Sequence, residues 1–191
     1  MLQIVPSSVG RTLSGLRAGL TEVVYLAPGV AEIPETISVT SAAFGKTERL
    51  PQRYTADGEG LSPPLAWSNV PETTQAFLVL VEDADSPSPR PLVHAIAWGI
   101  AGDVRGLPEA ALNAVDGATR SCILGLNSTL RRSYLPPDPP PGHGDHQYLF
   151  QVYALDQAVE FDEPPGRSAI VDTVRGLATA KGCLVGIYSR D

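Results

Sequence analysis

Short apolar runs separated by turn-forming residues make up most of the chain from residue 37 onward. The runs are rich in Val, Leu and Ile and are bounded by Gly, Pro, Ser and Asp, a pattern typical of β-strands. The expected strands are ISVTSAAF (37–44), AFLVLVED (76–83), LVHAIAWGI (92–100), YLFQVYALD (148–156) and CLVGIYS (183–189). Because no strand–helix alternation repeats between them, we expect a mostly β fold, an antiparallel β-sandwich with a few peripheral helices.

Two segments carry apolar residues at helical spacing instead. Residues 167–179 predict one helix, through Ile170, Val171, Val174 and Leu177. Near the N-terminus the spacing predicts a single amphipathic helix ending at Pro28–Gly29, through Val9, Leu13, Leu16, Leu20, Val23 and Val24. We therefore expect an N-terminal helical extension over 1–35 and the main domain over 36–191. The extension is expected to pack on its own domain or on a second subunit as a homodimer; a membrane-surface helix is disfavoured because no lysine-rich stripe follows the polar face.

Composition and charge narrow the classes of partner. With 191 residues, 43% of them hydrophobic, the chain is long enough for one domain with a real core. The net charge of −7 argues against a nucleic-acid or anionic-membrane surface, which requires clustered Lys and Arg. The two cysteines, Cys122 and Cys183, are expected to be free thiols. There is no recognisable secretory signal and no 18-residue apolar run for a membrane span, so we expect a cytoplasmic protein.

Acidic, histidine and tyrosine side chains gather at the predicted strand ends. The run 76–83 ends in Glu82 and Asp83, with Asp85 just beyond, and the next strand begins close to His94. His146 and Tyr148 stand at the start of a third strand, after the proline–glycine loop PPPGHGDHQY (139–148). If these strands are neighbours, Asp83, the two histidines and Tyr148 meet at one rim of the sheet. His143, flanked by glycines, is expected to be a solvated bystander at the loop tip.

Two chemistries suit this cluster and both stay open at this point. Two imidazoles and one carboxylate can form a facial triad for iron or zinc. Alternatively, Asp83 can orient one imidazole so that N–H groups face a phosphate or carboxylate. The usual sequence signatures of serine hydrolases, phosphate-loop nucleotidases, dinucleotide enzymes and zincins do not occur in the chain.

Several motifs, in order and spacing, resemble the phosphatidylethanolamine-binding protein (PEBP) family, and most closely its bacterial group often called Raf kinase inhibitor-like proteins. They are RYTADGEGLSPPLAWSNVP (53–71), VLVEDADSP (79–87), LVHAIAWGI (92–100), PPPGHGDHQYLFQVYALD (139–156) and LVGIYSR (184–190). The resemblance covers about residues 36–190. It implies an antiparallel β-sandwich with a shallow anion-binding pocket at one end.

The resemblance also implies a set of ligand-binding residues. Asp83 and Asp85 match the acids of the family's D-P-D-A-P turn, and Pro87 matches its proline. His94 matches the strand histidine, and His146 and Tyr148 match the H-R-Y element. Pro139 and Pro140 match the prolines at the pocket mouth. Gln147 stands where the family has Arg, so an ion pair that the Arg would make is in question.

Three functions follow from these residues. The leading one is non-catalytic binding of a small anionic ligand, a phosphate or carboxylate group, with no cofactor, no bound metal and no catalytic residue. The second is regulatory: the same rim docks a protein partner, as an inhibitor of a kinase or another enzyme. The third is a hydrolase or metal enzyme that uses Asp83, His94 and His146, although Ser86 and Ser88 lack a nucleophile motif.

Overall fold

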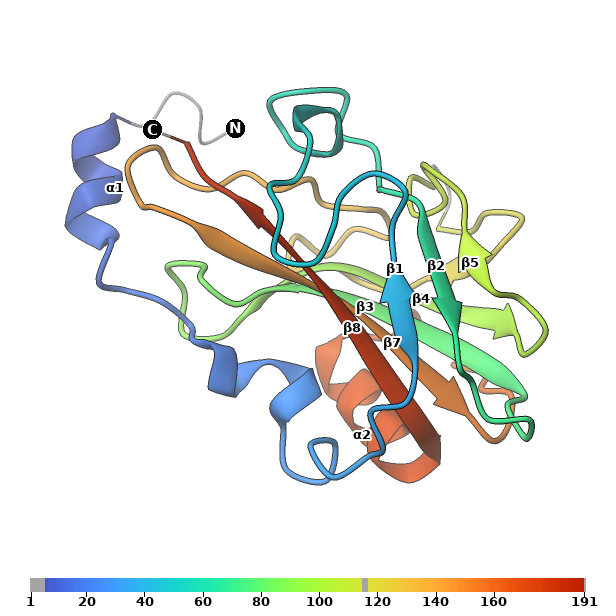
Figure 1. Cartoon of the computed structure of the whole chain (residues 1–191). Helices are drawn as coiled ribbons and strands as arrows, with labels where there is room; N and C mark the ends of the chain where they lie inside the picture. Colours follow the sequence, from blue (N-terminus) through green and yellow to red (C-terminus); the bar gives the residue numbers. More distant parts are fainter. Residues whose placement is uncertain (1–5, 115–116, 191) are drawn as a thin grey trace.

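Strands dominate the protein, whose computed structural model describes residues 6–114 and 117–190 (Figure 1). The helices are α1 (Ser7–Leu13) and α2 (Arg167–Leu177), with 3-10 turns η2 (Leu20–Glu22), η3 (Val24–Leu26) and η4 (Gln52–Tyr54). The strands are β1 (Ser38–Thr40), β2 (Leu65–Ser68), β3 (Ala76–Asp83), β4 (Leu92–Ala101), β5 (Gly106–Leu107), β6 (Ile123–Leu124), β7 (His146–Leu155) and β8 (Ala178–Tyr188). Within the described ranges, no helix has both the length and the apolar character needed to cross a bilayer.

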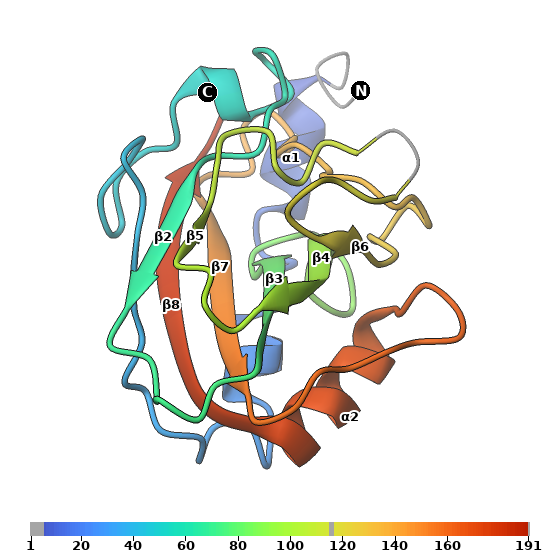
Figure 2. The same ribbon diagram turned by 90° about the vertical axis from the view of Figure 1, so that its right-hand side faces the viewer.

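The strands form two antiparallel sheets. The smaller sheet has the order β1-β2-β5, and the larger has the order β6-β4-β3-β7-β8 (Figures 1 and 2). A cluster of buried side chains joins the two sheets, including Val39 and Trp67 of the smaller sheet and Phe150 of the larger. This arrangement confirms the mostly β fold with antiparallel sheets and few helices.

The central strand β3 is buried on both faces. Alternate residues such as Phe77 and Val79 belong to the cluster between the sheets. The residues between them, Leu78 and Leu80, belong to a second cluster that includes Ile170 of α2 and the N-terminal segment. A strand covered on both sides is expected to be continuously apolar, which explains the uninterrupted run AFLVLVED.

The long strands lie where the apolar runs predict them, but some predicted elements begin or end at other residues than expected. β3 matches 76–83 residue for residue, and β4 extends the run 92–100 by one position. The expected strand 37–44 is only β1, because the Ser41 hydroxyl donates to the Pro64 carbonyl and accepts from the Ala43 amide, which forms a local turn. The predicted helix 167–179 ends at Leu177, since Ala178 already pairs with Leu155 as the start of β8.

The expectation of one long N-terminal helix is wrong. α1 ends at Leu13, and the chain continues in extended form to the turns η2 and η3. Gly19 has φ = 94°, a left-handed conformation that a helix does not contain. In addition, the Ala18 and Gly19 amides donate to the carbonyls of Ser86 and Ala84, so the backbone bonds outside itself. Residues 1–5 of the expected extension lie outside the described residues.

The later part of this segment packs on its own domain. Val23, Val24 and Val30 are buried in the second core cluster. The Lys181 ammonium of β8, 2% exposed, donates to the carbonyls of Tyr25, Val30 and Ala31 at 2.9, 2.8 and 3.1 Å. A buried cation with several acceptors is well satisfied, and here every acceptor belongs to residues 25–31.

A buried carboxylate holds the same segment from the other side. Glu82 of β3 is fully buried and accepts from the Val24 amide at 2.7 Å, the Gln151 side-chain amide at 2.8 Å and the Arg167 Nε at 2.8 Å. These donors come from the N-terminal segment, β7 and α2. Glu82 therefore ties three elements to the central strand, and it is a structural residue rather than part of the rim.

The two cysteines are free thiols, as expected. Cys122 is buried and Cys183 is half-buried. Burial raises the pKa of the Cys183 thiol to about 12, so this group stays protonated near neutral pH.

Candidate functional site

The strand order brings the predicted site residues to one end of the larger sheet. β3 lies between β4 and β7 and is antiparallel to both, so its C-terminal end meets the start of each neighbour. Asp83 pairs with Leu92 of β4 on one side and with Tyr148 of β7 on the other. The predicted convergence of Asp83, His94, His146 and Tyr148 at this rim is confirmed.

A small cavity of about 140 Å³ opens at this rim. Its lining consists of Asp83, Ser86, Pro87, Leu92, His94, Leu135, Pro136, Asp138, Pro139, Pro140 and His146. Of the eight residues predicted to bind ligand, six line the cavity, all except Asp85 and Tyr148. Their contact with a ligand stays a prediction.

One wall of the cavity was missed by the sequence analysis. Leu135, Pro136 and Asp138 lie before the proline–glycine motif, in a stretch with no strand signal. Arg190, near the C-terminus, holds this wall: its guanidinium donates to Asp138 at 2.6 Å and to the Pro139 carbonyl at 2.8 Å. No strand or helix pattern in the sequence marks this wall, because Asp138 is half-buried in an irregular stretch.

Asp83 begins a row of hydrogen bonds that leads away from the cavity. Its carboxylate lies 2.8 Å from His146 Nδ1, and His146 Nε2 lies 2.7 Å from His143 Nδ1. His143 Nε2 in turn donates to the carbonyls of Leu13 and Leu16, at 2.9 and 3.2 Å. Both rings and the carboxylate are almost entirely buried.

This row holds one proton more than neutral histidines supply. Each of the three links, from Asp83 to His146, from His146 to His143 and from His143 to Leu13, requires one hydrogen. Two neutral imidazoles bring only two, so a third is shared along the row. Burial and the neighbouring His146 lower the pKa of His143.

The expectation that His143 is a solvated bystander is wrong: its exposed fraction is 1%. The N-terminal segment covers it, and Figure 1 shows α1 beside the loop that leads into β7. The approach is very close, since a Cβ atom at Gly10 would lie 2.0 Å from the Pro141 carbonyl oxygen. Only glycine fits at this position of the contact.

Asp85 faces the N-terminal segment. Arg17 donates to it at 2.7 Å and also donates to the carbonyls of Asp145 and His143. Gln147 donates to the other carboxylate oxygen through its backbone and its side chain, at 2.8 and 3.3 Å. Asp85 therefore has a cationic partner, Arg17, which comes from a part of the chain outside the motifs.

His94 has one ring nitrogen satisfied and one without a partner. Its Nδ1 lies 2.6 Å from the Leu135 carbonyl, which can only accept, so the hydrogen is on Nδ1. Burial lowers the pKa of His94, and the Asp83 charge opposes this only in part. The ring is therefore neutral near pH 7. Nε2 is buried and unpartnered among the described residues, as is the hydroxyl of Tyr148, whose ring packs edge-on against His94 at 5.2 Å.

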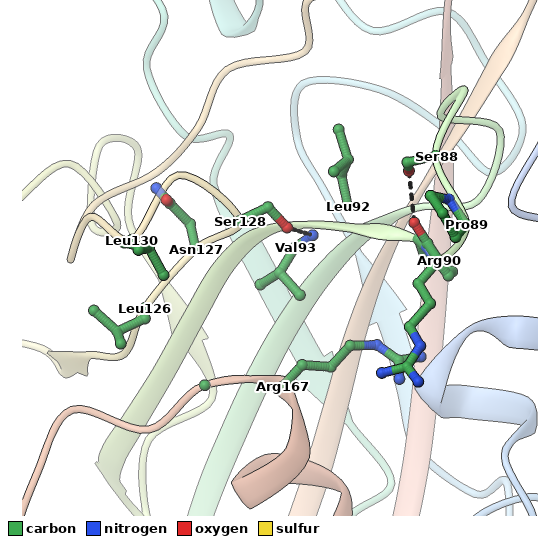
Figure 3. A pocket seen from close by; sticks show the side chains of 12 residues that line it. Ser88, Pro89, Arg90, Leu92, Val93, Leu126, Asn127, Ser128, Leu130 and Arg167 are labelled. Atoms are coloured by element: carbon green, nitrogen blue, oxygen red, sulfur yellow. Dashed lines mark hydrogen bonds between the residues drawn. The ribbon is translucent and has the colours of Figure 1, made fainter.

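A larger and more open hollow of about 510 Å³ adjoins the cavity, with Leu92 lining both (Figure 3). Its lining is largely apolar and includes the exposed Leu130 together with Arg90 and Arg167. Its framework is fixed by two bonds drawn in Figure 3: Ser88 donates to the Arg90 carbonyl, and the Val93 amide donates to Ser128, both at 2.7 Å. Across residues 6–114 and 117–190, no three potential metal-ligating side chains come together as a metal site.

Comparisons with known proteins agree on one family. The family model described as phosphatidylethanolamine-binding protein matches residues 40–189. A protein of Aquifex aeolicus, described only as a UPF0098 protein, is 33% identical over 159 residues, covering 81% of this chain and 90% of its own length. The crystal structure of a PEBP homologue from Chlamydia trachomatis has a TM-score of 0.72 at 30% identity, covering 82% of this chain and 99% of that one. YbcL of Escherichia coli, described as a member of the mammalian PEBP family, has a TM-score of 0.75 at 25% identity with the same coverage.

Proposed function

The chain belongs to the phosphatidylethanolamine-binding protein family, and from its cavity we propose that it binds a small anionic head group, a phosphate or a carboxylate, between His94 and His146. Asp83 orients His146, and Pro139 and Pro140 form the wall at the entrance. Binding requires no cofactor and no chemical step.

The observation that carries this proposal is the pair of buried polar atoms without partners. An unsatisfied buried polar group costs about 1–3 kcal/mol, so such groups are rare unless water or a ligand completes them. His94 Nε2 and the Tyr148 hydroxyl are two of them; the two rings pack edge-on against each other, and His94 lines the cavity. A phosphate or carboxylate oxygen entering the cavity is a suitable partner.

The size of the cavity limits the ligand to a head group. About 140 Å³ is well below the roughly 300–1,000 Å³ of pockets that enclose a drug-sized molecule. A phosphate group fits this space, and the remainder of a larger ligand would extend outward past Leu92.

Head-group binding is better supported than the two alternatives. A hydrolase requires a nucleophile beside a base, but the Ser86 and Ser88 hydroxyls bond to each other at 2.8 Å and neither bonds to a histidine. Docking of a protein partner has no specific contact in the described residues that favours it.

Histidine ring NMR during titration with inorganic phosphate, phosphoethanolamine and acetate tests the proposal. The chain has three histidines, so each ring can be assigned by substitution. We expect saturable shifts of His94 and His146 at millimolar ligand. Arg90→Ala is the matched control, because Arg90 lines the adjoining hollow and not the cavity. Rings that do not respond, or a response that the control abolishes, would show the proposal to be wrong.

A further inference from the structure

We infer that the cavity selects an oxyacid group that still carries a hydrogen, such as a monoprotonated phosphate, and that binding of the dianion takes up one proton. This inference rests on the proposed function and names the ligand form that the same cavity accepts. Four features of the rim support it.

The first is the direction of the free nitrogen of His94. Since Nδ1 gives its hydrogen to the Leu135 carbonyl, the unpartnered Nε2 presents a lone pair. A lone pair attracts an O–H group and repels the oxygen of a fully deprotonated anion. The ligand must therefore bring a hydrogen, or one must be taken from solvent.

The second is the lack of donors in the wall. Pro87, Pro136, Pro139 and Pro140 line the cavity and have no backbone N–H. The hydroxyl of Ser86, which also lines it, already bonds to Ser88. A dianion in this cavity would find few hydrogen bonds to replace those it had in water.

The third is that the cavity lining contains no Lys or Arg, and that the arginines near the rim are paired with carboxylates. None of the eleven lining residues is Lys or Arg. Arg190 is the nearest cation to the wall, and Asp57 and Asp138 already bind it. Arg17 is bound to Asp85. Because each of these two guanidinium groups already faces a carboxylate, the rim favours a ligand of lower charge.

The fourth is an unpartnered donor, Tyr148, whose ring packs against the ring of His94. The Tyr148 hydroxyl is buried and unpartnered, and burial raises the pKa of Tyr148, so it keeps its hydrogen. A monoprotonated phosphate in the cavity can donate its O–H to Nε2 of His94, which lines the cavity. The balance is one dianion plus one proton from solvent giving one bound monoanion, with no covalent bond made or broken in the protein.

This arrangement discriminates between anions of the same shape. Phosphomonoesters have a second pKa of about 6, so protonating the dianion near neutral pH costs little free energy. Sulfate has the same tetrahedral geometry but carries no proton in this range. We therefore expect phosphate and phosphomonoesters to bind at least ~10-fold more tightly than sulfate, since one mismatched hydrogen bond in a buried site is worth about 1–3 kcal/mol.

Calorimetry in two buffers of different ionisation enthalpy tests the inference. At pH 7.5 we expect close to one proton taken up for each phosphoethanolamine bound, because a phosphomonoester is almost entirely dianionic there. Between pH 7.5 and 8.5 we expect the affinity for phosphoethanolamine to fall about 10-fold, the slope of a single linked proton. His94→Asn is the informative variant, because its amide can still donate to the Leu135 carbonyl while the Nε2 acceptor is removed. It should lose both the proton uptake and the preference for phosphate over sulfate, and its melting curve shows whether it is folded.

The outcomes separate the inference from the proposed function. Phosphate binding without proton uptake, or equal binding of sulfate, overturns the inference and leaves head-group binding intact. Unchanged uptake in folded His94→Asn also overturns it, because the proton would then reside elsewhere. Failure of phosphate, phosphoethanolamine and sulfate to bind the unmodified protein overturns both. If His94→Asn does not fold, the ring nitrogen shifts of His94 in the unmodified protein decide, since Nε2 must change from a free to a hydrogen-bonded acceptor on binding.

Discussion

Replacing Glu82 with Gln removes a buried charge while keeping the shape of the side chain. In the structure the carboxylate accepts three hydrogen bonds, from the N-terminal segment, β7 and α2, and pairs with Arg167. The amide of Gln has one acceptor oxygen and two N–H donors, so at least one of the present donors would face an N–H group. Arg167 would also lose its carboxylate partner.

The expected loss of stability follows from these contacts. Breaking a buried ion pair by removing one partner costs about 3–5 kcal/mol. Arg167 is about one quarter exposed, so water compensates part of its loss, and we expect the lower end, about 3 kcal/mol. For a domain of 150–250 residues each kcal/mol lowers the melting temperature by about 2–4 °C, which predicts a decrease of about 6–12 °C.

Thermal and urea unfolding followed by circular dichroism measure this change, with Glu109→Gln as the matched control. Glu109 also accepts three hydrogen bonds, two from Arg53 and one from Tyr54, but this group lies at the surface. We expect a much smaller shift there, because exposed ion pairs contribute little. Equal shifts in the two variants would refute the argument that burial of Glu82 determines its contribution.

Two further predictions concern the N-terminal contact and the pH dependence of stability. Gly10→Ala should displace α1, because the new Cβ would lie 2.0 Å from the Pro141 oxygen. Gly15→Ala is the control and should be tolerated, since nothing lies within 4 Å of a Cβ at that position. Amide hydrogen exchange of residues 7–16 should be faster in Gly10→Ala than in Gly15→Ala, and equal exchange in the two variants would contradict the contact. Burial lowers the pKa of His94 and of His143 below the usual value of about 6.5, so below that pH the unfolded chain binds more protons and stability falls as the pH falls. Urea unfolding between pH 7 and pH 5 measures this slope, which should be shallower in His94→Asn; a slope that this variant leaves unchanged would show that His94 does not cause it.

The apolar runs were sufficient to predict the centre of the fold. A strand buried on both faces has an unmistakable pattern, so β3 could be read from the sequence alone. The predicted convergence of Asp83, His94 and His146 was conditional on β3, β4 and β7 being neighbours. The structure supplies that order, and chain direction then decides which ends meet. The shorter strands β5 and β6 have two residues each and leave no such pattern.

The N-terminal segment shows what the pattern could not predict. Its apolar residues recur at helical spacing, yet the backbone amides of Ala18 and Gly19 bond to the turn after β3 rather than within a helix. The spacing of apolar residues indicates which side chains are buried, but it does not fix the backbone conformation. Here hydrogen bonds to a distant loop override the helical tendency of the segment. The burial of His143 depends on the same contact, and so do the partners of Asp85.

The pairing of Arg17 with Asp85 also bears on where the functional unit begins. The match to the family model starts at residue 40, so the leading segment looks dispensable when judged by that match. A chain trimmed at residue 36 would leave Lys181 without its three carbonyl acceptors and Glu82 without the Val24 amide. It would also remove the carbonyls of Leu13 and Leu16, which accept from His143 Nε2. The start of the family-model match is therefore not a border of folding, and a minimal domain for this protein should retain the residues that precede it.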